Sequence, residues 1–294
     1  MAKARLILVH GRAQQGKSER ALIEEWMTPL RDALGARAAC LDDVEVRAPF
    51  YGDRLMELLA QLGEPEPGDI IVRGPQLYDA EADYRAFLGA YLDEVRAQEG
   101  VSEEQVVAEA GIAALERGPQ NWPWVLAIIR TLDKIPGIDG DMIERVLRDV
   151  WMYLERRTVR KEIDAIVAPA FDTELPVVCV AHSLGTVVAY HILRDRGHGA
   201  VAHLTTVGSP LGLKICREAL APIAHPKVVG SWHNARDRRD VVALYPLDAS
   251  HFPIEPAVAN YDGVWNRTPN AHGISGYVND HRVVDVLHRA LVAL

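Results

Sequence analysis

The stretch 176–190, Pro-Val-Val-Cys-Val-Ala-His-Ser-Leu-Gly-Thr-Val-Val-Ala-Tyr, places a serine where it could act as a nucleophile. The β-branched run at 177–180 is typical of a strand buried on both faces, and apolar residues at helical spacing follow at 186–193. Ser183 is therefore expected at the sharp corner between the strand and the helix. A serine hydroxyl in such a corner can attack a carbonyl carbon once a neighbouring base takes its proton.

The residues that flank Ser183 are small, as such a corner requires. The pattern is Ala181-x-Ser183-x-Gly185, which is similar to the G-x-S-x-G nucleophile elbow with alanine in place of the first glycine. Small neighbours let strand and helix approach closely, and the strained turn then holds the serine Oγ above the sheet. In a second interpretation Ser183 only caps the turn. A catalytic role therefore requires an acid, a base and an oxyanion hole elsewhere in the chain.

Two aspartates are candidates for the acid. A strand is expected at 227–232, and Asp237 and Asp240 lie in the polar segment that follows it. A carboxylate at this place can orient a catalytic histidine. We prefer Asp240, because the apolar pair directly after it could anchor it, and keep Asp237 as the alternative. In a third interpretation both belong to a solvated acidic and basic turn.

His272 is the candidate base. It lies in a loop between a strand expected at 263–267 and the last helix, and the glycine after it leaves the loop free to reach Ser183. The order serine, aspartate, histidine along the chain is the order that accompanies a nucleophile elbow. His281 and His288 lie on one polar stripe of the last helix, which is typical of surface histidines.

The start of the chain carries a second motif. The apolar run 6–9 is typical of a buried parallel strand, and it leads into Gly-Arg-Ala-Gln-Gln-Gly-Lys-Ser at 11–18, a literal match to the phosphate-binding pattern G-x-x-x-x-G-K-[ST]. In one interpretation the backbone N–H of Arg12 forms half of an oxyanion hole. In the other, 11–18 binds nucleotide phosphates, although its residues are bulkier than the usual glycine-rich set. Without a phosphate, Ser18 would cap the following helix.

Composition excludes several classes of protein. The chain has 294 residues, 49% of them hydrophobic, and its net charge of −9 comes from acidic and basic residues that are mixed throughout. Because there is no basic stripe, nucleic acid is not an expected partner. Cys40, Cys179 and Cys216 are odd in number and far apart, which is typical of a reducing compartment. No apolar run reaches membrane-spanning length, so we expect a soluble, cytoplasmic protein without a transmembrane segment.

The middle of the chain, from about 79 to 170, is expected to be helical. Apolar residues recur at helical spacing at 142–154, and Ser102-x-x-Gln105 is typical of a capping box. The densest aromatic and aliphatic cluster lies at 122–135, and it could line an acyl pocket or belong to the core. These helices could form a lid over the strand ends or cover a face of the sheet. Apolar stripes alone do not distinguish the two arrangements.

Four motifs together resemble a known family. They are Val-Ala-His-Ser-Leu-Gly at 180–185, Val-Gly-Ser-Pro-Leu-Gly at 207–212, Asp-Val-Val at 240–242 and the late His272. Over about 1–75 and 171–294 the chain resembles the α/β-hydrolase superfamily, particularly its lipase and serine-esterase members. The resemblance implies that Ser183 is the nucleophile, His272 the general base and Asp240 its orienting acid. It also implies an oxyanion hole formed by the backbone N–H groups of Arg12 and Leu184.

The resemblance implies an α/β fold with a mostly parallel central sheet and helices on both faces. The core would comprise 1–78 and 171–294, and 79–170 would be a helical insertion that could act as a lid or cap. The chain departs from the family pattern in two ways. Ala181 replaces the first glycine of the elbow, and the insertion precedes the elbow, whereas caps in this superfamily more often follow a later strand.

The expected activity is cleavage of an ester through an acyl-enzyme on Ser183, with thioester and amide bonds as further candidates. The expected substrate is a small-molecule or lipid-like acyl compound. No cofactor is expected, and no metal, since the histidines show no metal-ligand spacing. Two alternatives remain: a P-loop nucleotide-binding protein that uses 11–18, and a catalytically silent hydrolase-like scaffold that binds partners. The sequence does not indicate an oligomeric state.

Overall fold

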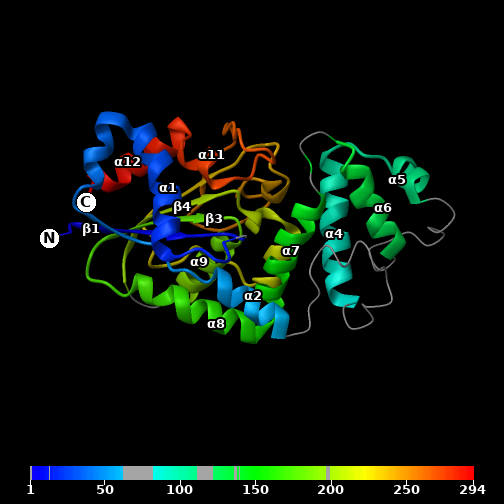
Figure 1. Ribbon diagram of the computed structural model, residues 1–294, viewed down its shortest axis with the longest axis horizontal. Helices are drawn as coiled ribbons and strands as arrows, with labels where there is room; N and C mark the ends of the chain where they lie inside the picture. The colour runs from blue at the N-terminus through cyan, green and yellow to red at the C-terminus, as the bar shows by residue number, and fades with distance from the viewer. Residues whose placement is uncertain are drawn as a thin grey trace.

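In the computed structural model, the described residues form one central sheet of six parallel strands (Figure 1). Their order across the sheet is β2-β1-β3-β4-β5-β6. Parallel neighbours need crossover connections, and helices on both faces supply them. The predicted α/β fold class, a parallel sheet between two layers of helices, is confirmed. The strands are β1 (Ala4–Val9), β2 (Val44–Arg47), β3 (Val177–His182), β4 (Val201–Val207), β5 (Trp232–Ala235) and β6 (Ala259–Tyr261). The structure describes residues 2–12, 14–61, 82–110, 122–135, 138, 140–196 and 199–294.

Side chains of the central strand β3 alternate between two hydrophobic cores. Val177, Cys179 and Ala181 belong to the core on one face of the sheet, and Val178 and Val180 belong to the core on the other. Every residue of β3 is buried. The strand is a continuous apolar run in the sequence because helices cover both of its faces.

Helices cover the two faces of the sheet in separate layers (Figure 1). One layer consists of α1 (Glu19–Leu34), α11 (Ile274–Val278) and α12 (His281–Val292). The other contains α2 (Gly52–Gln61), α8 (Arg157–Val167) and α9 (Leu184–Asp195). Ser18 caps α1, as in the interpretation of 11–18 without a phosphate, with its Oγ accepting from the backbone N–H of Ala21 at 3.2 Å. No helix in the described part of the chain is both long and apolar enough to cross a membrane.

The helical middle of the chain connects to the sheet through α7 (Gly140–Glu155). Both α7 and α8 pack against α9, so they cover the same face of the sheet as α9. Beyond α7 lie α4 (Ala82–Gln98), α5 (Glu103–Ala110) and α6 (Trp122–Leu132) (Figure 1). Buried side chains of α4, α6 and α7 share one continuous core with the sheet. The remaining short helices are η1 (Gly35–Leu41), η4 (Ala168–Phe171), η5 (Pro210–Gly212), α10 (Lys214–Ala219) and η6 (Val241–Ala243).

Two late strands differ from their expected positions. The strand expected at 227–232 begins only at Trp232, as β5, and Val229 forms no more than an isolated bridge with Val201. The prediction of a strand at 263–267 is wrong, because the structure has no strand in this segment. The last strand, β6, ends before it, at Tyr261.

A row of polar side chains inside the sheet explains both differences. Thr206 Oγ1 donates to Asn234 Oδ1 at 3.0 Å, and Asn234 Nδ2 donates to Asn260 Oδ1 at 3.1 Å. These side chains satisfy one another across β4, β5 and β6, although their polarity is typical of a loop in the sequence. By contrast, the backbone N–H of Asn266 donates to the carboxylate of Asp237 at 2.7 Å and not to a neighbouring strand.

Gly185 is the position at which α9 comes closest to the end of β1. A Cβ built there would lie 2.5 Å from the carbonyl oxygen of His10 and closer still to that of Val9, and both atoms belong to the backbone. We therefore expect Gly185→Ala to lower the free energy of unfolding by about 3 kcal/mol or more, measured by urea denaturation. Ala181→Gly is the control on the other side of Ser183, with an expected loss of about 1 kcal/mol. Equal stability of the two variants would contradict this packing.

Candidate active site

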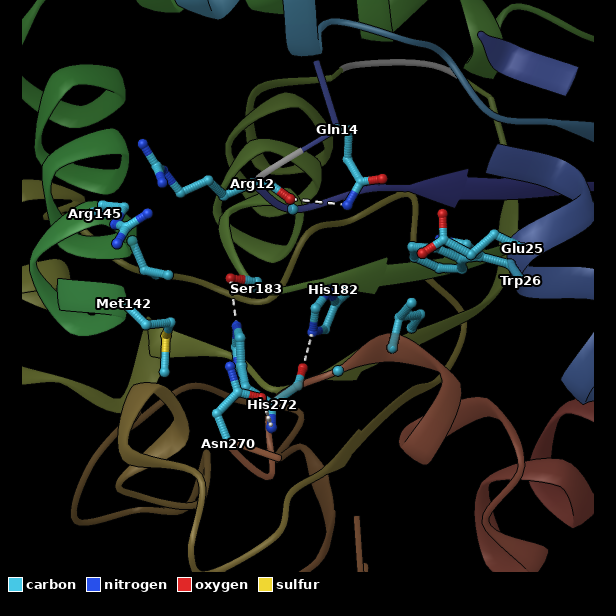
Figure 2. Close-up of a pocket in the computed structure, with 14 residues that line it drawn as sticks. Arg12, Gln14, Glu25, Trp26, Met142, Arg145, His182, Ser183, Asn270 and His272 are labelled. Carbon is cyan, nitrogen blue, oxygen red and sulfur yellow. Dashed lines mark hydrogen bonds between the residues drawn. The ribbon is translucent and has the colours of Figure 1, made fainter. Parts of the chain in front are cut away.

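The turn between β3 and α9 holds Ser183 in a strained backbone conformation. Ser183 has φ of 55° and ψ of −128°, which residues with a side chain rarely adopt. Its backbone N–H donates to the carbonyl of Val207 at 3.2 Å, and its own carbonyl accepts from Thr186 Oγ1 at 2.7 Å. These bonds hold the turn at the edge of a cavity that Ser183 lines (Figure 2).

His272 lies directly beside Ser183. Its Nε2 is 2.9 Å from the Oγ of Ser183, although 89 positions separate the two residues in the chain (Figure 2). Both side chains are buried within the protein and line the same cavity. This is hydrogen-bond distance for a base that takes the proton of the hydroxyl.

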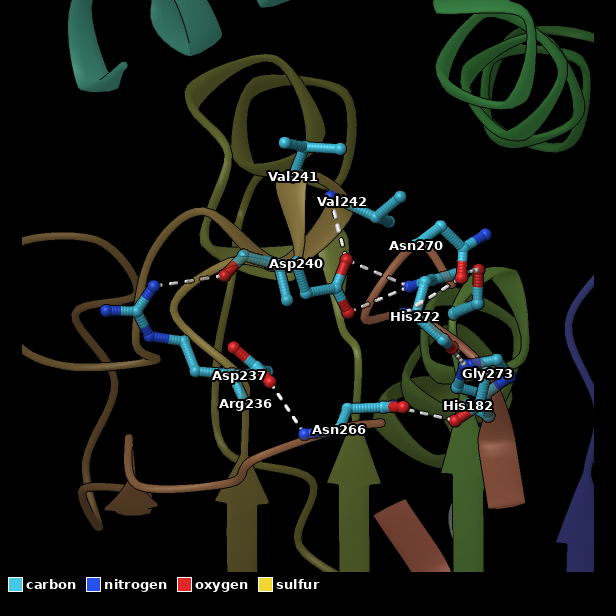
Figure 3. A network of polar contacts seen from close by, with 12 residues as sticks. His182, Arg236, Asp237, Asp240, Val241, Val242, Asn266, Asn270, His272 and Gly273 are labelled. Carbon is cyan, nitrogen blue, oxygen red and sulfur yellow. Dashed lines mark hydrogen bonds and ion pairs between the residues drawn. The ribbon is translucent and has the colours of Figure 1, made fainter. Parts of the chain in front are cut away.

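Asp240 lies on the far side of the imidazole. Its Oδ2 is 2.8 Å and its Oδ1 3.0 Å from Nδ1 of His272 (Figure 3). The carboxylate is fully buried and also accepts from the backbone N–H of Val242 at 3.0 Å and from the hydroxyl of Tyr277 at 2.5 Å. Because every contact to this carboxylate is a donor, Nδ1 of His272 carries the proton and Nε2 accepts the bond from Ser183.

Asp237, the alternative acid, contacts Asn266 and Arg239. One of its oxygens accepts from the backbone N–H of Asn266 at 2.7 Å (Figure 3). Its carboxylate also forms an ion pair with Arg239 at 2.5 Å. It therefore anchors the segment that leads to the loop of His272. Of the two candidates, the structure brings Asp240 to the imidazole.

Asn266 organises the loop that carries His272, a role that our sequence reasoning missed. Its side-chain oxygen accepts from the backbone N–H of Thr268 at 3.0 Å and from the hydroxyl of the same residue at 2.6 Å. Its Nδ2 donates to the carbonyl of Gly273 at 2.7 Å. The loop is thus fixed on both sides of His272. Nothing in a single sequence distinguishes this asparagine from an ordinary turn residue.

His182 also contacts the loop that carries His272. Its Nε2 lies 2.8 Å from the carbonyl oxygen of His272 (Figure 2). Burial lowers the pKa of His182 to about 3, so the ring is neutral near pH 7 and Nε2 donates its one proton to this carbonyl. His182 therefore has a local structural contact with the loop of His272.

The two predicted oxyanion donors belong to segments that lie close to Ser183. Leu184 is the first residue of α9, where backbone N–H groups have no partner within the helix. The segment of Arg12 passes close by, because a Cβ on Gly11 would lie only 2.7 Å from the Cβ of Ser183. A helix N-terminus also favours negative charge, so the arrangement suits a developing oxyanion.

The P-loop motif at 11–18 is occupied by contacts within the protein. The backbone N–H of Gly16 donates to the carboxylate of Asp53 at 2.6 Å. Lys17 forms an ion pair with Glu25, and Ser18 caps α1. The N–H of Gly16 and the side chains of Lys17 and Ser18 therefore already have partners within the protein, and these contacts do not favour nucleotide binding.

The cavity at Ser183 has a volume of about 350 Å³ and a mixed lining. Its apolar wall comes from Trp26 of α1, Val146 of α7 and Ile274 of α11, and its polar side includes Arg12 and Arg145 (Figure 2). A site of this volume can hold a small acyl compound.

Other candidates from the sequence lie elsewhere. Within the cluster at 122–135, the described side chains of Trp124, Ile128 and Ile129 are buried in the core, and helix α7 supplies the cavity wall. His281 is exposed and His288 half-buried on α12, as expected for surface histidines.

Tyr277 is a second residue that sequence reasoning missed, although it lies in the helix that follows the His272 loop. Burial, followed by the charge of Asp240, raises its pKa well above the usual value, so the hydroxyl remains a donor to the carboxylate. We expect Tyr277→Phe to lower the free energy of unfolding by about 2 kcal/mol, measured by urea denaturation. Tyr261→Phe is the matched control, because its hydroxyl donates to an exposed carbonyl. Equal losses in the two variants would contradict a special contribution of Tyr277.

Comparison of the chain with protein-family models, with curated proteins and with solved structures finds no match. Support for a function therefore comes from the arrangement of Ser183, His272 and Asp240 around the cavity.

Proposed function

We propose that this protein is a serine hydrolase of the α/β-hydrolase type that cleaves an ester through an acyl-enzyme on Ser183. One observation carries the proposal: Asp240, His272 and Ser183 form a continuous chain of hydrogen bonds that ends at a cavity. The strained turn after β3 and the parallel sheet give it further support.

The reaction follows from the properties of these side chains. The neutral imidazole of His272 takes the hydroxyl proton as Ser183 Oγ attacks the ester carbonyl, and Asp240 stabilises the imidazolium that forms. His272 then gives this proton to the leaving alcohol as the carbon–oxygen bond breaks. In the second half, His272 takes a proton from a water molecule as the water oxygen attacks the acyl carbon. The bond between this carbon and Ser183 Oγ then breaks, His272 returns the proton to Ser183, and the acid leaves.

The negative charge of the tetrahedral intermediate needs preorganised donors. In this proposal the backbone N–H groups of Leu184 and Arg12 supply them, each with a contribution of about 3 kcal/mol in the transition state. Thioesters and amides would react by the same route. The cysteines of the described chain, Cys40, Cys179 and Cys216, are unpaired and buried, which supports a cytoplasmic location.

Replacement of the nucleophile is the direct test of the proposal. Ser183→Ala is expected to abolish both ester turnover and labelling by a fluorophosphonate probe, because the attacking oxygen is gone. Labelling is measured by intact-protein mass spectrometry. The control is Ser209→Ala, which removes a buried hydroxyl that contacts Thr186 and should leave labelling in place. Undiminished labelling of Ser183→Ala would show that the nucleophile lies elsewhere.

The two aspartates provide a separate test. Asp240→Asn is expected to lower kcat by about 10⁴-fold, since an amide no longer holds the productive tautomer of His272. Asp237→Asn removes an anchor of the loop and should lower the melting temperature, with a loss in kcat of about tenfold or less. Steady-state kinetics on one ester, with circular dichroism to verify folding, compares the two variants. A larger loss of kcat in folded Asp237→Asn would reverse the assignment.

A further inference from the structure

Tyr91, in helix α4, contacts the residue that directly follows Asp240. Its hydroxyl donates to the carbonyl of Val241, although 150 positions separate the two residues in the chain. Tyr91 is fully buried, so water does not compete for this bond. Helix α4 belongs to the helical insertion, and the insertion therefore reaches the segment that carries the candidate acid.

One peptide group joins this contact to the carboxylate of Asp240. The carbonyl of Val241 and the N–H of Val242 belong to the same planar peptide. This N–H donates to Oδ1 of Asp240 at 3.0 Å (Figure 3). Because the peptide is rigid, a bond that fixes its carbonyl also fixes the direction of its N–H. The same bond polarises the peptide, which strengthens the N–H as a donor.

Glu94 anchors α4 one turn after Tyr91. Its carboxylate accepts from the backbone N–H of Lys214 and from the hydroxyl of Tyr245. Lys214 begins α10, before β5, and Tyr245 lies two residues after η6. Helix α4 is thus tied to segments that precede and follow β5, so Tyr91 meets its acceptor from a helix that other contacts hold in place.

The hydroxyl of Tyr91 keeps its proton. Burial, followed by the charge of Asp240, raises the pKa of Tyr91 well above its usual value. The group is therefore a donor near neutral pH. Its removal would take this donor from the buried carbonyl of Val241, and a buried carbonyl that loses its partner favours a rearranged backbone.

We infer that Tyr91 is a positioning residue that holds Asp240 against His272. It acts through the peptide between Val241 and Val242, and it touches neither the cavity nor the nucleophile. This rests on the proposed hydrolase function, in which Asp240 orients the general base. The helical insertion then has a part in the catalytic arrangement beyond that of a lid.

Removal of the Tyr91 hydroxyl tests the inference. Tyr91→Phe should lower kcat for 4-nitrophenyl butyrate by about tenfold. KM should change by less than about twofold, because the cavity keeps its lining while the acid is misplaced. Circular dichroism verifies folding, which the loss of one oxygen atom should not prevent.

Tyr190→Phe is the matched control. The hydroxyl of Tyr190 also donates to a backbone carbonyl, that of Ala224, at 3.1 Å, and Tyr190 does not line the cavity. This variant should lose a hydrogen bond of the same kind and keep the wild-type kcat. An unchanged kcat in Tyr91→Phe, or equal losses in the two variants, overturns the inference.

Combination with Asp240→Asn distinguishes positioning of the acid from a general effect on the fold. In this background the amide no longer holds the productive tautomer of His272. The added Tyr91→Phe should therefore lower kcat by less than about twofold. A further tenfold loss in the double variant would show that Tyr91 acts independently of Asp240, and the inference would fail.

A spectroscopic measurement separates this inference from the proposed function. The proton on Nδ1 of His272, which is bonded to Asp240, should give a downfield proton NMR signal that is identified by its absence in His272→Gln. Tyr91→Phe should shift or broaden this signal, whereas Tyr190→Phe should not change it. If no ester is turned over and no probe labels Ser183, the hydrolase proposal fails while the signal still tests the inference. An unchanged signal in Tyr91→Phe overturns the inference even if the enzyme hydrolyses the ester.

Discussion

The buried carboxylate of Asp240 is the constraint on which the geometry of the candidate site depends. A charged group removed from water is costly unless its oxygens receive hydrogen bonds. Asp240 receives them from the backbone of Val242, the hydroxyl of Tyr277 and Nδ1 of His272. Val242 lies two residues after Asp240, whereas His272 and Tyr277 belong to the last part of the chain, so satisfying one carboxylate brings these two regions together. It also orients the imidazole, whose other nitrogen then meets Ser183.

The order of strands explains why the remaining parts converge at one edge of the sheet. From β1 the chain moves to β2 on one side, whereas from β3 it moves to β4 on the other. Neighbouring parallel strands whose connections leave in opposite directions form a crevice at their carboxyl ends. Gly11 follows β1 and Ser183 follows β3, so the segment proposed to supply an oxyanion donor and the turn of Ser183 meet there. Gly185 permits this contact because any side chain would overlap the backbone of β1.

The sequence predicted the parts of the fold that depend on local patterns. Strand β3 and helix α9 have clear apolar periodicities, and the small residues around Ser183 indicate the turn between them. The expectations that failed concern β5 and β6, where Asn234 and Asn260 satisfy each other across strands. Such pairing depends on neighbours that are distant in the chain, so polarity alone suggested a loop. The support of His272 by Asn266 and Tyr277 was missed for the same reason, since only the folded chain brings these groups together.

Helix α7 supplies residues that line the cavity and a residue that holds Arg12 beside it. Its Asp149 holds the side chain of Arg12, whose backbone N–H is a proposed oxyanion donor, and its Val146 lines the cavity directly. The net charge of −9 means that the molecule as a whole repels anions at long range. Charges beyond a Debye length of about 8 Å are largely screened in physiological salt, however, whereas partly buried groups are screened much less. The residues that line the cavity, and not the overall charge, therefore govern which groups can bind beside Ser183.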